Sequence, residues 1–153
     1  ALATRTGLDL IAAHLRDIRG LGASDLAGRL RMGLHQGVEV TDGPTSPGQL
    51  VNQIFCSALP VAYGRWPQPL WQDFAQLILD AAYEATLLAG VLNSRQGGSN
   101  IVLLTMLGGG AFGNAPEWIF AAIRRALHKA RGQGLDVRLV SYGPPSAEMR
   151  ALV

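Results

Sequence analysis

Apolar residues recur at helical spacing in two regions of the chain. Over residues 8–34 they follow one another at helical intervals, and Gly20 and Gly22 interrupt the run, so this region predicts two short helices. Residues 74–92 predict one long helix, with Asp73 able to cap its start. The apolar stripe of that helix comprises Phe74, Leu77, Ile78, Ala81, Ala85, Leu88 and Leu92.

Apolar stretches without helical spacing predict the strands. Residues 38–41 form a short β-branched segment, and residues 50–59 suit a strand that is buried on both faces. Residues 101–107 and 135–142 predict two more strands. Turn-rich segments occupy residues 42–48 and 64–71, and we expect the tryptophans of the second segment to lie exposed in a loop that covers a site.

A last helix is expected over residues 116–131. Asn114 and Glu117 form a capping-box pattern, and Pro116 suits a first helical turn. Its predicted buried face comprises Ile119, Ala122, Ile123, Ala126 and Leu127. Because strands alternate with helices, the pattern predicts an α/β fold with a largely parallel sheet, in a single domain over residues 1–153.

Composition and net charge limit the kinds of molecule that the chain is expected to bind. The chain has 48% hydrophobic and 16% charged residues and a net charge of +2, which fits a compact soluble domain and argues against nucleic acid as a primary partner. No apolar run predicts a membrane span. The single cysteine, Cys56, excludes an internal disulfide framework and suits a reducing, cytoplasmic compartment. His14, His35 and His128 share no ligand spacing, so no metal site is predicted, and each is expected on a helical segment.

Residues 108–113, GGGAFG, form a glycine loop between a predicted strand and a predicted helix. Four of its six positions are glycine, more than the positive φ angles of one turn require. Consecutive N–H groups in such a loop can form a concave site for an anion, usually phosphate, at the carboxyl end of a strand. A structural turn that permits close helix packing is the alternative interpretation.

The glycine spacing also satisfies G-x-G-x-x-G, the pattern of dinucleotide-binding folds. That pattern expects an acidic residue at the end of the next strand, where this chain has Val140 to Gly143, VSYG. Pro116 removes an amide from the first helical turn and Glu117 adds a carboxylate there, which opposes a phosphate on the helix axis. An anion is therefore expected on the loop itself.

Residues 104–113, LTMLGGGAFG, resemble the diphosphate loop of macrodomains, the ADP-ribose-binding α/β/α family, and more particularly of the branch near bacterial poly(ADP-ribose) glycohydrolases. Residues 37–42 (GVEVTD), 51–63 (VNQIFCSALPVAY) and 80–92 resemble upstream elements, and residues 7–10 (GLDL) resemble the end of the family's first ligand loop. A complete macrodomain begins with further strands and an Asn-Ala-Asn motif, which this sequence lacks. The resemblance implies a three-layer fold with a mixed, mostly parallel sheet.

The resemblance also implies roles for individual residues. The ligand-binding set would be Gly108, Gly109, Gly110, Ala111, Phe112, Gly113, Asn114 and Tyr142. Phe112 would face the distal ribose or anchor the loop in the core, and Tyr142 would stack on adenine or serve packing. Asp9 would be the catalytic acidic residue, stabilising an oxocarbenium-like state or activating water, and a helix-start charge is its alternative role.

These roles imply an ADP-ribose-binding hydrolase that needs no cofactor and removes ADP-ribose from modified proteins or from poly(ADP-ribose). Its partners would be ADP-ribose or an ADP-ribosylated protein. Two other functions stay open. One is a non-catalytic reader of ADP-ribose or a related nucleotide, and the other is an NAD(P)-dependent oxidoreductase.

Overall fold

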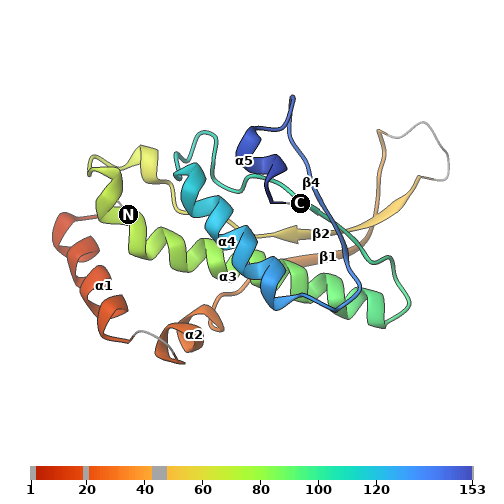
Figure 1. Ribbon diagram of the computed structural model, residues 1–153, viewed down its shortest axis with the longest axis horizontal. Coiled ribbons are helices and arrows are strands. Elements are labelled where there is room, and N and C mark those ends of the chain that lie inside the picture. The colour runs from red at the N-terminus through yellow and green to blue at the C-terminus, as the bar shows by residue number, and fades with distance from the viewer. Residues whose placement is uncertain (1–2, 19–20, 43–47, 153) are drawn as a thin grey trace.

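The computed structural model describes residues 3–18, 21–42 and 48–152, so most of the predicted turn at 42–48 lies outside the described residues. The helices are α1 (Arg5–Asp17), α2 (Leu21–Ala27), α3 (Gln72–Arg95), α4 (Pro116–Lys129) and α5 (Ala147–Arg150), with 3-10 turns η1 (Val61–Tyr63) and η2 (Gln68–Trp71). The strands are β1 (Gly33–Glu39), β2 (Leu50–Phe55), β3 (Ile101–Leu104) and β4 (Asp136–Leu139). Figure 1 shows α3 running through the middle of the molecule.

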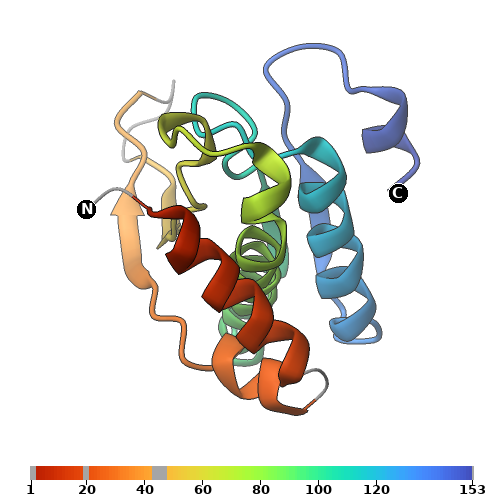
Figure 2. The same cartoon turned by 90° about the vertical axis from the view of Figure 1, so that its left-hand side faces the viewer.

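The core lies mainly between α3 and α4. Leu79 and Leu87 of α3 and Ile119 and Ile123 of α4 are the largest fully buried side chains, and Ala75, Ala82, Ala122 and Ala126 let the helices approach closely. The predicted buried face of α4 is confirmed, with Leu127 partly buried. In Figure 2, α1 and α4 flank α3 on opposite sides. The long central helix is thus the scaffold on which the other elements are placed.

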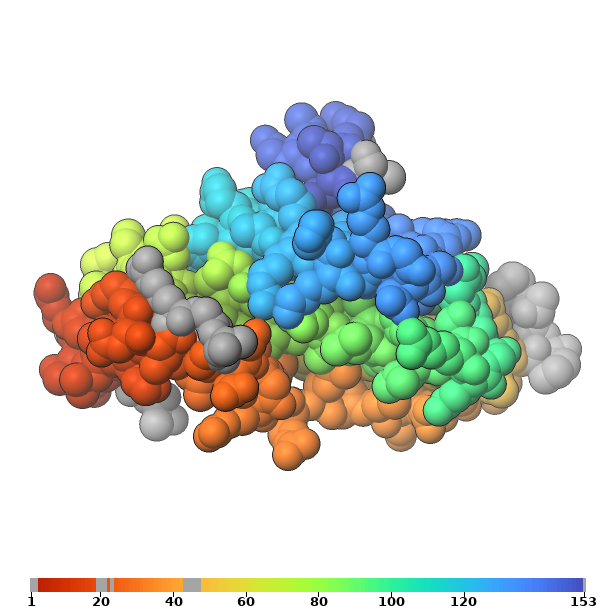
Figure 3. All heavy atoms as spheres, turned by 60° about the horizontal axis from the view of Figure 1, so that its bottom comes forward, coloured from red at the N-terminus to blue at the C-terminus, as the bar shows by residue number. Residues whose placement is uncertain are grey.

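The predicted apolar stripe of α3 is only partly covered. Leu88 is 55% exposed and Leu92 is 58% exposed, because α1 and α2 lie beside the first half of the helix only. Figure 3 shows α3 reaching the surface between α4 and the β1 strand. The face that carries Leu87 and Val91 is the buried one, since it meets α4 and β3.

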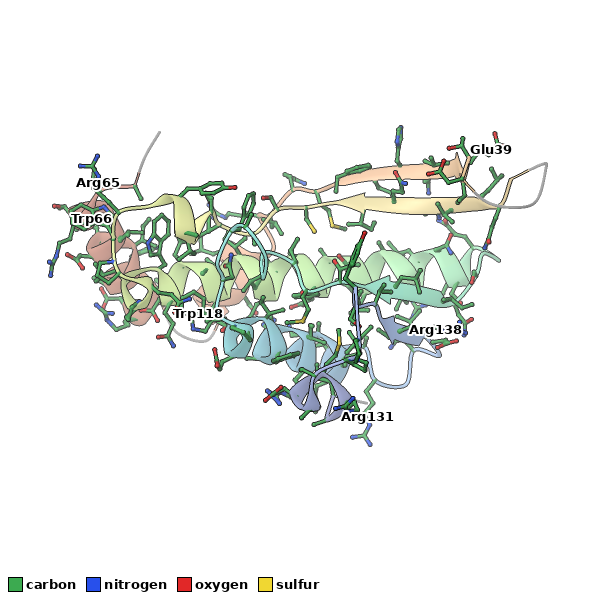
Figure 4. The ribbon with its side chains drawn as sticks, turned by 90° about the horizontal axis from the view of Figure 1, so that it is seen from above. Glu39, Arg65, Trp66, Trp118, Arg131 and Arg138 are labelled. Carbon is green, nitrogen blue, oxygen red and sulfur yellow. The ribbon has the colours of Figure 1, made fainter. Side chains whose placement is uncertain are left out.

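The expected mixture of helices and strands is present, but the described strands form two small sheets in place of one. β1 and β2 pair antiparallel, with Glu39 opposite Leu50 and Gly33 opposite Phe55. β3 and β4 pair parallel, in line with the prediction, and α4 connects them. Seen from above in Figure 4, the β1–β2 hairpin runs along α3 as a separate unit.

The prediction of a strand buried on both faces at residues 50–59 is wrong. β2 ends at Phe55, and Leu50 and Phe55 are 65% and 57% exposed. Its partner β1 is also mostly exposed and carries His35, which the sequence had placed on a helical segment. A hairpin packed against little else cannot bury both faces, although its apolar composition resembles that of a core strand.

The prediction of exposed tryptophans in residues 64–71 is also wrong. Trp71 is 5% exposed and belongs to the core cluster. The indole N–H of Trp66 donates to the carbonyl oxygen of Ala3 at 2.9 Å, and Figure 4 shows this side chain near the α1 end of the molecule. The segment therefore packs the start of the chain against α3.

Proline marks the start of α4 correctly, but the side chains predicted to cap α3 and α4 do not cap them. α4 begins at Pro116, as predicted, but its cap residue is Ala115, and Asn114 lies one residue earlier with its side chain buried. Trp71, with no capping side chain, precedes α3, and Asp73 lies in the first turn. The capping roles predicted for Asn114 and Asp73 are wrong, because each side chain has a different partner: Asn114 contacts Leu59 and Gly108, and Asp73 contacts Arg16.

The helical stretch Gln68–Arg95 is long and apolar enough, by length and composition, to cross a membrane. The central helix of a water-soluble protein meets the same criterion, and α3 supplies a large share of the buried core. Packing accounts for the apolar residues on the buried side of α3, whereas Leu88 and Leu92 remain exposed.

Candidate functional site

The glycine loop, residues 108–113, lies where the chain passes from β3 to α4. Gly108 and Gly113, its first and last residues, have φ angles of 75° and 67°. These left-handed angles favour glycine because a Cβ atom would be strained there. The two ends of the loop therefore have a conformational reason for their residue type.

Both ends of the loop also pack closely against the segment that follows β2. A Cβ atom on Gly108 would collide with the Cβ atom of Ala58, and one on Gly113 would lie 2.7 Å from the Cβ atom of Ala62. Gly109 has less room than an alanine prefers, since a Cβ atom there would lie 3.1 Å from Ile119 Cδ1. Gly108 and Gly113 are therefore explained by the fold alone.

Gly110 is different. Its φ angle is not positive, and a Cβ atom built on it would have no heavy atom within 4 Å. Neither backbone conformation nor packing in the described structure requires glycine at this position. A residue without a side chain next to open space lets a ligand approach the backbone closely.

The backbone amides of the loop fall into two groups. Gly109 donates to Met106 O at 3.0 Å and Gly113 donates to Gly110 O at 3.0 Å. The N–H group of Gly108 and the three successive N–H groups of Gly110, Ala111 and Phe112 have no acceptor among the residues that the structure describes. Gly110 and Ala111 are exposed and Phe112 is half-buried. Unpaired, accessible N–H groups in succession are what an anion-binding loop provides.

Asn114 holds the base of the loop. It is 2% exposed, and its side-chain amide donates to Leu59 O at 2.8 Å and to Gly108 O at 3.2 Å, while its backbone N–H also donates to Gly108 O. Its Oδ1 atom has no hydrogen-bond partner within the described residues. Asn114 thus ties the loop to the end of the segment after β2, and its buried amide supports the loop from within.

The segment after β2 forms a wall beside the loop. Ala62 N donates to Phe112 O at 2.9 Å, and Gln68 Nε2 donates to Gly113 O at 3.1 Å. The rings of Tyr63 and Phe112 meet edge to face, with centroids 5.7 Å apart, and Tyr63 is 63% exposed. Tyr63 and Gln68 were not predicted as site residues, because only the folded chain brings residues 61–68 to the loop.

Asp9 and Tyr142 are not brought to the loop by any hydrogen bond or ring contact of the described residues. Asp9 lies on α1 with its side chain 54% exposed, and its nearest charged partner is Arg5 Nε at 3.7 Å. Tyr142 follows β4 and is fully exposed. Among the described residues, Asp9 therefore has no observed link to the loop. Tyr142 follows β4, whose end lies beside the end of β3: Val140 N donates to Leu104 O at 2.8 Å, and Ser141 lines the same surface pocket as Met106.

Two surface pockets elsewhere in the structure differ in the polarity of the side chains that line them. One, of about 620 Å³, lies between α1, α2 and α3; His14 and Arg29 are its polar members, and the rest of its lining is apolar, which suits an apolar ligand better than a phosphate. The other, of about 460 Å³, borders Met106 at the start of the loop and carries the carboxylates of Glu117 and Glu148. Those carboxylates would repel an anion, so the open side of the glycine loop is the better phosphate site.

Burial raises the pKa values of the Cys56 and Tyr83 side chains. Burial raises the pKa of the Cys56 thiol, and a hydrogen bond with Thr86 offsets this only in part, which agrees with the inert thiol expected from the sequence. Burial also raises the pKa of Tyr83 to about 12. The described residues contain no group of three His, Cys, Asp or Glu side chains that could hold a metal ion.

A comparison of the chain with models of known protein families, with curated proteins and with solved structures gave no match. The assignment of function therefore rests on the geometry of the loop and on the local sequence resemblance.

Proposed function

We propose that the chain binds ADP-ribose, or the ADP-ribose group of a modified protein, with its diphosphate on the glycine loop. The observation that carries this proposal is the run of three unpaired amides at Gly110, Ala111 and Phe112, with open space beside the first of them, Gly110. Successive amides can donate to several oxygens of one phosphate, and the missing Cβ of Gly110 leaves room for close contact.

The aromatic pair beside the amides supports a nucleotide over inorganic phosphate. Phe112 packs partly against the core, and its ring partner Tyr63 is largely exposed. Exposed aromatic rings next to a phosphate site can pack against a ribose or a base, which adds affinity that free phosphate cannot gain. The sequence resemblance to macrodomains points to the same ligand.

We propose hydrolysis as a second step of this function, with Asp9 as the acidic residue, as the resemblance implies. The geometry supports binding more directly than catalysis, since Asp9 is exposed and paired with Arg5 on α1. An Asp9→Ala variant separates an enzyme from a reader. A parent chain that releases ADP-ribose from an ADP-ribosylated protein, with an Asp9→Ala variant that binds but does not release it, identifies an enzyme. Binding without release by the parent identifies a reader.

Calorimetric titration of the purified chain with ADP-ribose, and with NAD⁺ and AMP alongside, tests the binding proposal. We expect micromolar affinity for ADP-ribose, which corresponds to about −8 kcal/mol, and much weaker affinity for AMP, which lacks the diphosphate. Tight binding of NAD⁺ instead would favour the oxidoreductase. A folded chain that binds none of the three contradicts the proposal.

A further inference from the structure

Tyr83 is a buried polar side chain directly beneath the start of the glycine loop. It lies on α3, is 3% exposed and belongs to the core cluster. Its hydroxyl donates to the carbonyl oxygen of Thr105 at 2.7 Å and accepts the N–H of Leu107 at 2.9 Å. The hydroxyl group therefore both donates a hydrogen bond to, and accepts one from, the segment that follows β3.

The two backbone groups that Tyr83 contacts also meet each other. Leu107 N donates to Thr105 O at 2.9 Å, which closes a tight three-residue turn around Met106. The phenol oxygen completes a triangle with these two atoms, so the turn is held from below by a rigid aromatic side chain. In the next backbone bond, Gly109 N donates to the carbonyl oxygen of Met106, the residue at the apex of this turn. The path from Tyr83 to the loop is thus a continuous run of short contacts.

We propose that Tyr83 is a positioning residue, which fixes the direction in which the chain enters the glycine loop and so sets where the amides of Gly110, Ala111 and Phe112 lie. This inference rests on the proposed function. Tyr83 itself touches no ligand in this account, because its hydroxyl is buried against Thr105 and Leu107. Asn114 secures the other end of the loop, so its two ends are held from two different elements, α3 and the segment after β2.

The hydroxyl has this role independently of the ring. The ring packs in the core between α3 and its neighbours, and phenylalanine would keep that packing. The hydroxyl alone bonds the turn, and its loss would leave Thr105 O and Leu107 N with only each other. Tyr83→Phe therefore removes the positioning contact while it preserves the buried apolar surface.

The test compares Tyr83→Phe with Thr86→Val. Thr86 lies on the same helix, and its hydroxyl donates to Ala82 O and also bonds the Cys56 thiol, so the control loses a hydroxyl that contacts no residue of the loop. We expect Tyr83→Phe to shift the ¹H–¹⁵N resonances of residues 105–113 and to weaken ADP-ribose binding about tenfold or more. Thr86→Val should leave both unchanged. Unchanged loop resonances in Tyr83→Phe would overturn the inference.

A measurement on the parent chain keeps the inference testable if Tyr83→Phe does not fold. Hydrogen exchange of the Leu107 amide should be slowed nearly as much as that of buried amides in α3, because Tyr83 and Thr105 both accept its proton. Exchange as fast as that of an open loop would contradict the role of Tyr83. If the parent chain binds no ADP-ribose, the proposed function fails, whereas the resonance and exchange measurements still decide whether Tyr83 holds the loop.

Discussion

At the scale of single residues, the glycines of one short loop have different reasons to be glycine. Gly108 and Gly113 combine left-handed backbone angles with close contacts to Ala58 and Ala62, so the fold requires them. Gly110 has neither constraint. A sequence shows four glycines as equivalent letters, and only the backbone angles and neighbours separate the structural ones from the one that faces open space.

This difference predicts that alanine at Gly110 lowers ligand affinity, whereas alanine at Gly108 lowers stability. Gly110→Ala should leave the melting temperature unchanged and lower ADP-ribose affinity about tenfold, or about 1.4 kcal/mol, because the methyl group occupies the space next to the free amides. Gly108→Ala should cost at least about 1 kcal/mol of folding free energy from its left-handed backbone alone. Thermal unfolding and calorimetry check both. A Gly110→Ala variant with parental affinity would show that nothing approaches that backbone.

Tyr83 predicts a loss of stability in alkali. Its pKa is about 12 in the folded chain, because burial outweighs the opposing hydrogen bond from the Leu107 amide, and about 10 when unfolded. A pKa that is raised on folding contributes stability that is complete below pH 10 and is lost as the pH rises towards 12. The loss is on the order of 2 kcal/mol, measurable by urea unfolding between pH 9 and 12. Tyr83→Phe should show a smaller decrease over this range, and an equal decrease would exclude Tyr83 as its source.

At the scale of elements, α3 and α4 are joined by a charged cluster as well as by their apolar faces. Glu84 accepts from Lys129 Nζ at 2.6 Å and from Arg125 Nη1 at 2.7 Å, and Asp80 lies 3.7 Å from Arg125 Nε. Burial acts to raise the pKa of Glu84, but the hydrogen bonds from Lys129 and Arg125 outweigh it and lower that pKa. Burial raises the pKa of Asp80 in spite of its hydrogen bond with Gln76 and the charge of Arg125, so folding shifts the pKa values of the two carboxyl groups in opposite directions.

Glu84→Gln should therefore destabilise the chain in a pH-dependent way. We expect a loss of about 0.5–1.5 kcal/mol at pH 7. A carboxyl whose pKa is lowered on folding contributes stability above its unfolded pKa, and this contribution disappears as the pH falls through the folded value. The difference between Glu84→Gln and the parent should shrink towards pH 3 in denaturant titrations. Asp17→Asn, at an exposed carboxylate of α1, is the control; a difference that is independent of pH would contradict this assignment.

At the scale of the whole molecule, the two sheets differ in how firmly they are held. β3 and β4 pack on α3 and α4, and Leu104 is 3% exposed. The β1–β2 hairpin is mostly exposed, and a side-chain hydrogen bond from Asn52 to Asn93 links it to α3. A two-stranded hairpin with little apolar cover is marginally stable on its own.

The hairpin should consequently open before the rest of the chain. We expect amides of β1 and β2 to exchange with deuterium at least tenfold faster than those in the middle of α3 and α4, because local opening exposes little buried apolar surface. Hydrogen exchange followed by mass spectrometry of peptides from each element measures this. Equal protection of the hairpin and α4 would show that the chain unfolds as one cooperative unit.

Periodicity and local backbone chemistry were sufficient for much of this fold. The first helix α1, the long helix α3, and α4 with its buried face and its start at Pro116 follow from side-chain spacing and from the fixed φ angle of proline. The second N-terminal helix is confirmed only in part, because α2 includes Gly22 and ends at Ala27, and Leu34 lies in β1. The parallel pairing of β3 and β4 follows from the helix between them. The position of the glycine loop at the end of β3 was also predictable, since each of these signals is local.

Tertiary structure decided what depends on contacts between distant residues. Leu87 is buried and Leu88 is exposed because α4 and β3 cover one side of α3. The sequence cannot distinguish the two residues, since both are leucine. Residues 61–68 border the glycine loop, and Tyr83 meets Thr105 and Leu107, only because the chain returns to them in space. The sequence by itself determined which segments are helical and where the candidate loop lies, because those properties depend on neighbouring residues. The folded chain decided which faces are buried, which strands pair and which glycine is free, because packing satisfies hydrogen bonds and covers apolar surface across long separations in sequence.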